Sequence, residues 1–177
     1  VRVAVTMRTP GDDFELAAGF LYGEGVYETL RTYAREPFLF AEHMARLRRS
    51  AALMALDVPW SDAELASLVS QTMVAHSGLD EAYIRILLTR GVGELTYNPS
   101  ACPQPSLIII VKPFAGPAAS TFTQGIDVAL VAVRRNHPTA LDPQIKSNNL
   151  LNNALAMQEA LRHGAEEALM RNHDGDV

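Results

Sequence analysis

The chain has 177 residues and a formal net charge of −5 at pH 7, and 48% of its residues are apolar. This size and composition fit one sizeable or two small soluble domains, and the acidic balance argues against a nucleic-acid-binding surface. No apolar run approaches the length of a membrane span, no signal peptide is visible, and a single cysteine, Cys102, fits a reducing cytoplasm.

The first third of the chain is predicted to begin with an edge strand. Residues 1–7 have the pattern of that strand, and a turn at 10–13 leads into a short helix over 14–21. A glycine turn then precedes a strand that ends at Tyr33. One face of this strand carries Val26, Glu28, Leu30 and Thr32.

Two helices and two strands follow. Apolar residues at helical spacing predict a helix over 41–56, and a capping box at 61–64 opens a second helix that stops at Gly78. Residues 82–89 and 107–111 have strand patterns, and the continuous apolar run of the second indicates burial on both faces. Together these elements predict an α+β fold.

The last part of the chain begins with a connection rich in small residues and proline, followed by a strand over 126–133, a loop, a helix over 147–163 and a strand that starts at Ala168. Ser147 is the expected N-cap of the helix, and Lys146 would lie just before its first turn, where free N–H groups favour an anion. From spacing alone, a solvated loop lysine is the ordinary interpretation. The expected buried face of the helix consists of Leu150, Leu151, Ala154, Leu155 and Leu161.

Three separated motifs carry a resemblance to one enzyme family. They are the glycine turn and strand Gly23-Glu24-Gly25-Val26-Tyr27-Glu28, the sequence His43-Met44-Ala45-Arg46-Leu47, and Ile145-Lys146-Ser147 followed by Asn149-Leu150-Leu151-Asn152-Asn153. In this order they resemble the class IV (fold type IV) pyridoxal-phosphate aminotransferases. That family includes branched-chain aminotransferases, D-amino-acid aminotransferases and aminodeoxychorismate lyases.

The resemblance implies the cofactor pyridoxal 5′-phosphate and assigns three site residues, with no metal. Lys146 is the implied catalytic and cofactor-binding residue, which forms a Schiff base and later shuttles the substrate proton. Arg46 is the implied phosphate-binding residue, because its planar fork pairs with two oxygens at once. Tyr27 is implied to border the substrate pocket. From the residues alone, a helix-surface arginine and a packed tyrosine are the ordinary alternatives.

The resemblance also implies a two-domain architecture. A small α/β domain over 19–113 lacks only its first strands, 114–124 is the interdomain linker, and 125–177 begins a cofactor-binding domain. The chain ends on Asp174-Gly175-Asp176-Val177 as if entering a strand, so we expect a C-terminal truncation that impairs turnover. Residues 1–18 instead resemble a segment of the formate dehydrogenase accessory sulfurtransferases, without their Cys-x-x-Cys, and no sulfur transfer is expected.

The implied reaction is transamination of an amino acid to a 2-oxo acid, with these small molecules as the partners and a homodimer for the full-length protein. The segments 89–95 and 135–143 look more like the branched-chain type. Leu95 and Tyr97 stand where D-amino-acid aminotransferases carry an arginine and a histidine, whereas Leu151 replaces a tyrosine of many branched-chain enzymes. D-amino-acid aminotransferase chemistry, aminodeoxychorismate lyase chemistry and an inactive cofactor-binding fragment are the alternatives.

Overall fold

The computed structural model describes residues 3–5, 25–76, 79–93, 96 and 98–177. The chain forms two compact units. Unit 1 consists of Val1–Ala115 and Ile145–Asn148, and unit 2 consists of Gly116–Gln144 and Asn149–Val177. The domain limits expected from the sequence stay predictions.

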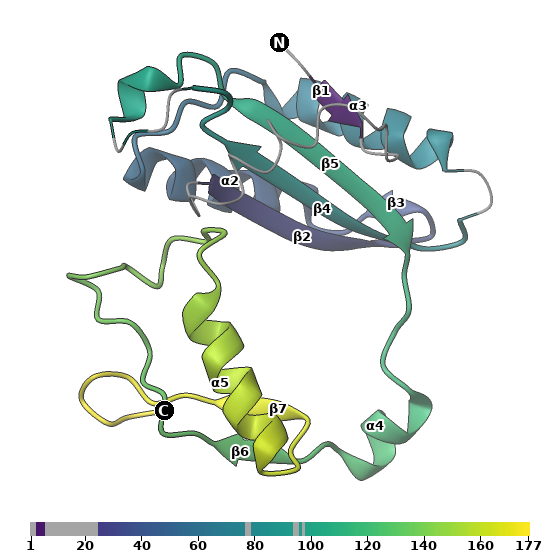
Figure 1. Ribbon diagram of the computed structural model, residues 1–177. Helices are drawn as coiled ribbons and strands as arrows, with labels where there is room; N and C mark the ends of the chain where they lie inside the picture. The colour runs from purple at the N-terminus through teal and green to yellow at the C-terminus, as the bar shows by residue number, and fades with distance from the viewer. Residues whose placement is uncertain (1–2, 6–24, 77–78, 94–95, 97) are drawn as a thin grey trace. The chain divides into compact units, whose positions relative to one another are not determined.

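Unit 1 is built on a five-stranded sheet with the strand order β1-β5-β4-β2-β3 (Figure 1). The strands are β1 Val3–Val5, β2 Gly25–Tyr33, β3 Glu36–Pro37, β4 Ala82–Thr89 and β5 Ser106–Pro113. β1 pairs with β5 in parallel, and the other neighbours are antiparallel. The edge strand expected over 1–7 is therefore confirmed for Val3–Val5, whereas the helix expected over 14–21 lies outside the described residues.

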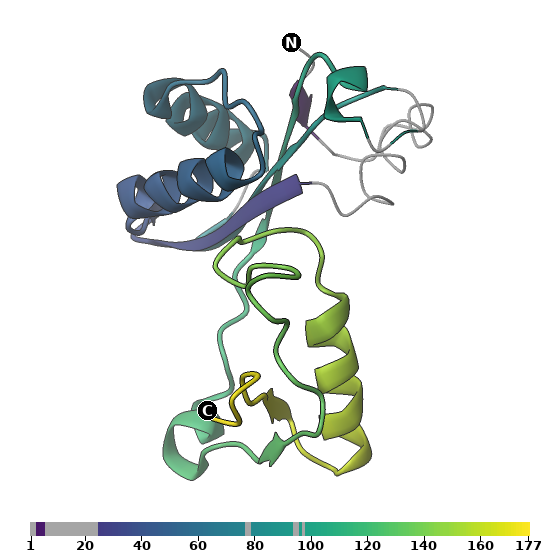
Figure 2. The ribbon, with the colours of Figure 1, turned by 90° about the vertical axis from the view of Figure 1, so that its left-hand side faces the viewer.

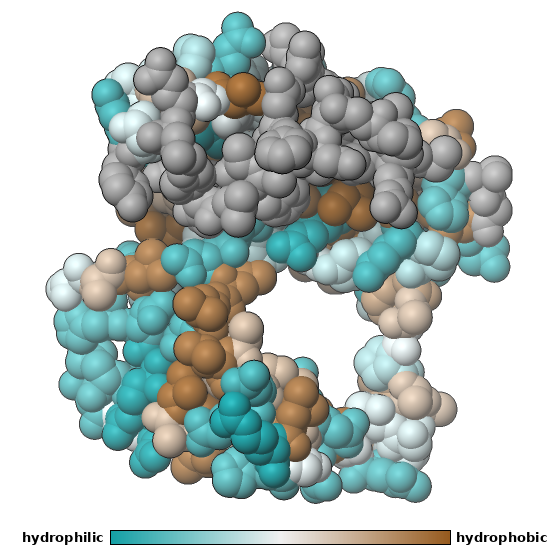
Figure 3. Space-filling view, in the orientation of Figure 1, coloured by the Kyte–Doolittle hydropathy of each residue, from teal (hydrophilic) through white to brown (hydrophobic). Residues whose placement is uncertain are grey.

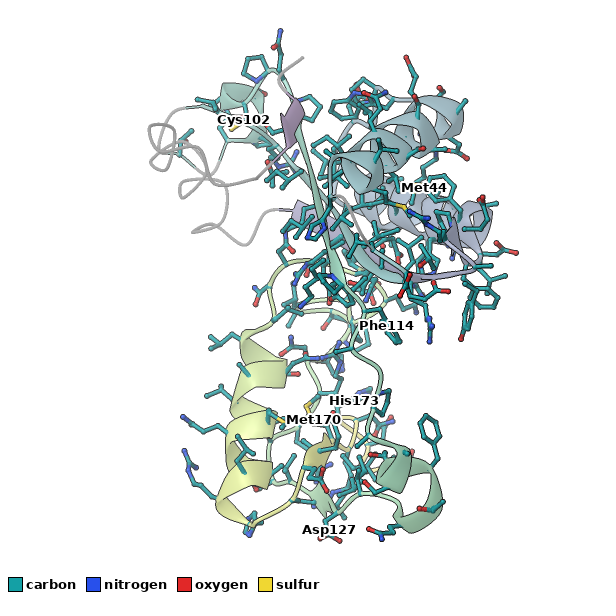
Figure 4. All side chains as sticks on the ribbon, turned by 90° about the vertical axis from the view of Figure 1, so that its right-hand side faces the viewer. Met44, Cys102, Phe114, Asp127, Met170 and His173 are labelled. Atoms are coloured by element: carbon teal, nitrogen blue, oxygen red, sulfur yellow. The ribbon has the colours of Figure 1, made fainter. Side chains whose placement is uncertain are left out.

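Helices α2, Phe40–Leu53, and α3, Asp62–Ala75, cover one face of this sheet (Figure 2). Both helices expected from the sequence are confirmed, including the reciprocal capping box between Ser61 and Glu64, although α2 ends at Leu53 and α3 at Ala75, each earlier than predicted. Met44 points from α2 into the apolar core (Figure 4), which also contains Leu47 of α2 and Ile84 and Ile86 of β4. Full burial of a side chain such as Leu47 stabilises the fold by about 2 kcal/mol.

Unit 2 contains two helices and a two-stranded parallel sheet. Its elements are α4 Ala119–Gln124, β6 Val128–Leu130, α5 Leu151–Arg162 and β7 Glu167–Leu169. The expected linker therefore contains a short helix, and β6 is shorter than the strand expected over 126–133. None of the helices in the described part of the chain has the length and apolarity that crossing a membrane requires.

Two predictions about α5 are wrong. The helix begins at Leu151 after an N-cap at Leu150 that makes no side-chain hydrogen bond, so Ser147 is not its cap. Its buried side chains are alanines, Ala156 and Ala160, which pack with Val131 in a small core. The leucines expected inside are exposed, and apolar side chains line the visible side of α5 (Figure 3). Their exposed fractions are 65% for Leu151, 47% for Leu155 and 60% for Leu161.

Candidate active site

The segment around Lys146 belongs to unit 1 and pairs with the outer edge of β2. The N–H of Tyr27 donates to the carbonyl oxygen of Lys146 at 3.0 Å, and the N–H of Asn148 donates to the carbonyl of Gly25 at 2.8 Å. Val26 and Ser147 form an antiparallel bridge between these two bonds. The N-terminal half of β2 therefore lies between β4 on one side and this segment on the other.

The close approach of this segment requires glycine at position 25. A Cβ atom there would lie 2.8 Å from the carbonyl oxygen of Leu88 and 2.9 Å from the side-chain nitrogen of Asn148. Real Cβ atoms do not approach other heavy atoms so closely, so any larger residue would push β4 or the segment away. The glycine at position 25 of the sequence motif thus has a packing reason.

Lys146 is held from both sides of its peptide backbone. Its N–H donates to the hydroxyl oxygen of Ser50 on α2 at 3.1 Å, and its carbonyl accepts from Tyr27. The neighbouring Ile145 packs against the core of unit 1. Since α5 starts at Leu151 in the other unit, the expected placement of Lys146 at a helix N-terminus is wrong. Its position comes from pairing with β2 and from α2.

The ring of Tyr27 contacts two cations. The Nζ of Lys146 lies 4.3 Å from the ring centroid, and the guanidinium carbon of Arg85 lies at the same distance. Arg85 also donates through Nη2 to Oδ1 of Asn148 at 3.4 Å, and its buried Nε has no hydrogen-bond partner among the described residues. Cation–π contacts of this kind keep the aromatic ring beside the lysine amine.

Arg46 is oriented by a buried carboxylate. Glu28 projects from β2 with a fully buried side chain and accepts from Nε of Arg46 at 2.6 Å and from Nη2 at 2.7 Å. Nδ1 of His43 lies 2.8 Å from the same carboxylate, which can only accept, so this nitrogen carries the donated proton. A protonated Nδ1 cannot also accept a hydrogen bond, so the 3.4 Å contact between this nitrogen and Nη2 of Arg46 is not a hydrogen bond.

The charged forms of Glu28 and Arg46 are stabilised by the hydrogen bonds among Glu28, His43 and Arg46. Burial raises the pKa of Glu28, but the hydrogen bonds from Arg46 and His43 outweigh burial and hold the pKa of this carboxyl below its usual range. The hydrogen bond to Glu28 in turn raises the pKa of the Arg46 guanidinium. The glutamate therefore stays ionised and the arginine stays charged, as a phosphate-binding fork requires.

Both predicted cofactor residues are linked to helix α2: Arg46 lies on it, and Lys146 is bonded to it through Ser50. Arg46 and Ser50 lie one turn apart on α2, about 6 Å along its axis, and Ser50 holds the backbone of Lys146. The side chain of Arg46 is 45% exposed, so part of the guanidinium is accessible to a ligand while Nε and Nη2 bond to Glu28. An accessible guanidinium, a primary amine and an aromatic ring suit a phosphorylated aromatic aldehyde, so these residues fit pyridoxal phosphate.

Sequence reasoning missed four residues of this cluster, and one of them left a signal. Glu28 alternates with apolar residues on the core-facing side of a strand, a pattern that indicates a buried charge with a partner. Ser50, Arg85 and Asn148 have no such local signal, because their contacts are with distant segments. Leu95 and Tyr97, on which the comparison of substrate loops depended, lie outside the described residues.

Comparison with known proteins points to the same family as the sequence motifs around Tyr27, Arg46 and Lys146. The family profile described as "Amino-transferase class IV" matches residues 25–177. The chain therefore belongs to the class IV aminotransferases, and its fold is the mixed helix-and-strand fold of that family.

Similar proteins with names from more than one branch of the family match this chain. A putative branched-chain-amino-acid aminotransferase of Methanocaldococcus jannaschii is 36% identical over 159 residues, which are 90% of this chain and 54% of that protein. A D-alanine aminotransferase of Staphylococcus aureus is 33% identical over 160 residues, again 90% of this chain and 54% of the relative. The crystal structure of the Escherichia coli branched-chain amino acid aminotransferase matches with a TM-score of 0.80 and 31% identity, over 87% of this chain and 52% of that one. The chain thus spans about half the length of these relatives.

Proposed function

We propose that this protein takes part in pyridoxal-phosphate-dependent transfer of an amino group from an amino acid to a 2-oxo acid. The observation that carries the proposal is the single helix α2, which bears Arg46 and, one turn later, the serine that holds Lys146. An amine and a phosphate-binding guanidinium in one frame are what a cofactor anchored at both ends requires. When bound, the cofactor supplies an electron sink that stabilises negative charge at the substrate α-carbon.

Each residue of the cluster has a defined role in this proposal. Nζ of Lys146 would hold the cofactor through its aldehyde carbon. Once released, this amine would take the proton from the substrate α-carbon and deliver it to the former aldehyde carbon of the cofactor. The accessible edge of Arg46 binds the phosphate, and Glu28 fixes the orientation of the arginine fork. Tyr27 lies against the lysine amine and forms a wall of the substrate pocket.

Branched-chain amino acids are the favoured substrates of this proposal. The matching names include branched-chain aminotransferases, and the segments 89–95 and 135–143 resemble that branch. D-alanine is the alternative that the staphylococcal relative supports. A screen with leucine and D-alanine as amino donors, and with aminodeoxychorismate as a lyase substrate, distinguishes the three branches of the family. Turnover of leucine above the other two is the expected result.

The chain is suited to a direct test, because it has only two lysines, Lys112 and Lys146. The 177-residue protein is mixed with pyridoxal phosphate, reduced with borohydride and mapped by peptide mass spectrometry. We expect the pyridoxyl group on Lys146, retained in Lys112→Arg and lost in Lys146→Arg. Lys112 is a matched control, since its Nζ also lies against a tyrosine ring, 4.6 Å from the centroid of Tyr83. Equal labelling of both lysines would refute the proposal.

A further inference from the structure

Ser50 makes a hydrogen bond that is unusual for a helical serine. Its side chain is buried, with 2% exposure, on the face of α2 that carries Arg46. Serine hydroxyls within helices ordinarily bond to the carbonyl of the preceding turn. The hydroxyl of Ser50 instead accepts the backbone N–H of Lys146, a residue 96 positions further along the chain.

This bond completes the fixation of Lys146. The carbonyl of Lys146 is already held by the N–H of Tyr27 at 3.0 Å, so strand β2 fixes one side of the residue. The hydroxyl of Ser50 fixes the other side, and it does so from the helix that orients Arg46 through Glu28. Without this acceptor, the lysine would be tied to the strand alone, and its distance from Arg46 would no longer be set by one rigid element.

We propose that Ser50 is a positioning residue for Lys146: its hydroxyl sets the register between the lysine amine and the Arg46 guanidinium. The inference rests on the proposed function, because it supposes that these two groups hold the ends of one cofactor. The buried hydroxyl of Ser50 acts through its bond to the backbone of Lys146. Its effect is geometric, and a displacement of about 1 Å in a positioned reactive group is enough to weaken its function by orders of magnitude.

The first test measures the hydrogen bond itself in the cofactor-free protein. Amide hydrogen exchange of Lys146 is followed by NMR in the parent chain, in Ser50→Ala, in Ser50→Cys and in Thr72→Val. Thr72 is a matched control, because its buried hydroxyl donates within α3, to the carbonyl of Leu68, and not to the lysine segment. We expect exchange at Lys146 to be about tenfold faster in Ser50→Ala and intermediate in Ser50→Cys, whose thiol is a weaker acceptor.

The second test measures the consequence for cofactor capture. Borohydride trapping on Lys146 is titrated with pyridoxal phosphate, and the half-saturating concentration is expected to rise about tenfold in Ser50→Ala and not in Thr72→Val. The β4 amides, whose exchange reports the core of unit 1, show that the variants are folded. A purely structural role would change these amides together with Lys146, and it would not order the variants as Ser, Cys, Ala.

The outcomes separate the two proposals. Unchanged exchange at Lys146 in Ser50→Ala overturns the positioning role, and so does faster exchange with an unchanged trapping titration. A parent chain that captures no pyridoxal phosphate on Lys146 overturns the proposed function. In that case the amide exchange of Ser50→Ala and Ser50→Cys still decides whether Ser50 fixes the lysine backbone.

Discussion

Replacement of Glu28 by glutamine tests whether a buried charge holds Arg46 in place. The Glu28 carboxylate accepts two bonds from Arg46, at 2.6 and 2.7 Å, and one from His43 at 2.8 Å. Glutamine keeps the shape, but its amide group turns an N–H toward one of these donors, so at least one charge-assisted bond is lost. Such bonds contribute about 1.5–3 kcal/mol. Because water resolvates the exposed part of Arg46, we expect the free energy of unfolding to fall by about 2 kcal/mol.

A double-mutant cycle with Arg46→Met isolates the interaction. Arg46→Met leaves the carboxylate buried with His43 as its remaining partner in the cluster, and removal of one member of a buried ion pair costs about 3–5 kcal/mol. The double variant should therefore lose about 1.5 kcal/mol less than the sum of the single variants. Urea unfolding gives these values. Asp62→Asn, which weakens the exposed pair between Arg48 and Asp62, should cost less than about 1 kcal/mol.

The same variants have a defined pH dependence. Because the pKa of Glu28 is lowered in the folded state, its contribution to stability is fully present above the unfolded carboxyl pKa of about 4.3. It is lost as the pH falls through the lowered folded-state pKa. Glu28→Gln has no group to titrate there, so the stability difference between parent and variant should shrink between about pH 5 and pH 2. Additive losses of stability in the Glu28→Gln and Arg46→Met cycle would show that the two side chains do not interact. A stability difference between parent and Glu28→Gln that is the same at pH 5 and pH 2 would show that the Glu28 charge does not stabilise the fold.

Three further changes have simple expected outcomes. Ser61→Ala removes the cap of α3 and should lower the free energy of unfolding by about 1 kcal/mol in thermal or urea unfolding, while trapping of pyridoxal phosphate is unchanged. Gly25→Ala places a Cβ against the carbonyl of Leu88 and should weaken trapping on Lys146, since the lysine segment must move; unaltered trapping would contradict this. Tyr27→Phe keeps the cation–π contact with Lys146 and should bind the cofactor like the parent, whereas Tyr27→Leu should bind it more weakly in a fluorescence titration.

The elements of unit 1 could be predicted because their signals are local. The apolar stripe of α2, the capping box of α3 and the strand patterns of β4 and β5 are each contained in a single stretch of sequence. The lysine segment behaves differently. Ser147 is a reasonable N-cap by composition, but pairing of Lys146 and Asn148 with β2 outweighs that local preference, and the helix starts only at Leu151.

The buried face of α5 differs from the predicted one, again because the deciding contacts are with distant segments. Leucines at helical spacing predicted the inner face, but the small core of unit 2 receives Ala156 and Ala160 instead. Alanine lets a helix approach a neighbouring strand closely, and no count of apolar residues along the helix shows which stripe does so. The spacing of apolar residues along a sequence predicts that a segment is helical. Which face of the helix is buried depends on the segment that packs against it.

The site shows the same division between local and distant information. His43, Arg46, Leu47 and Ser50 recur at the spacing of one helical face, so the helix brings them together, although nothing in the sequence marks Ser50 as part of the site. Leu47 lies in the core and anchors this face against the sheet, so the polar residues beside it are held by a rigid element rather than by a loop. What the sequence cannot give is the partner of each: Glu28 on β2 for the arginine, and the Lys146 backbone for the serine. The chemistry of the cluster therefore depends on how accurately α2 is seated on β2, and changes in core packing at Leu47 should affect cofactor capture as well as stability.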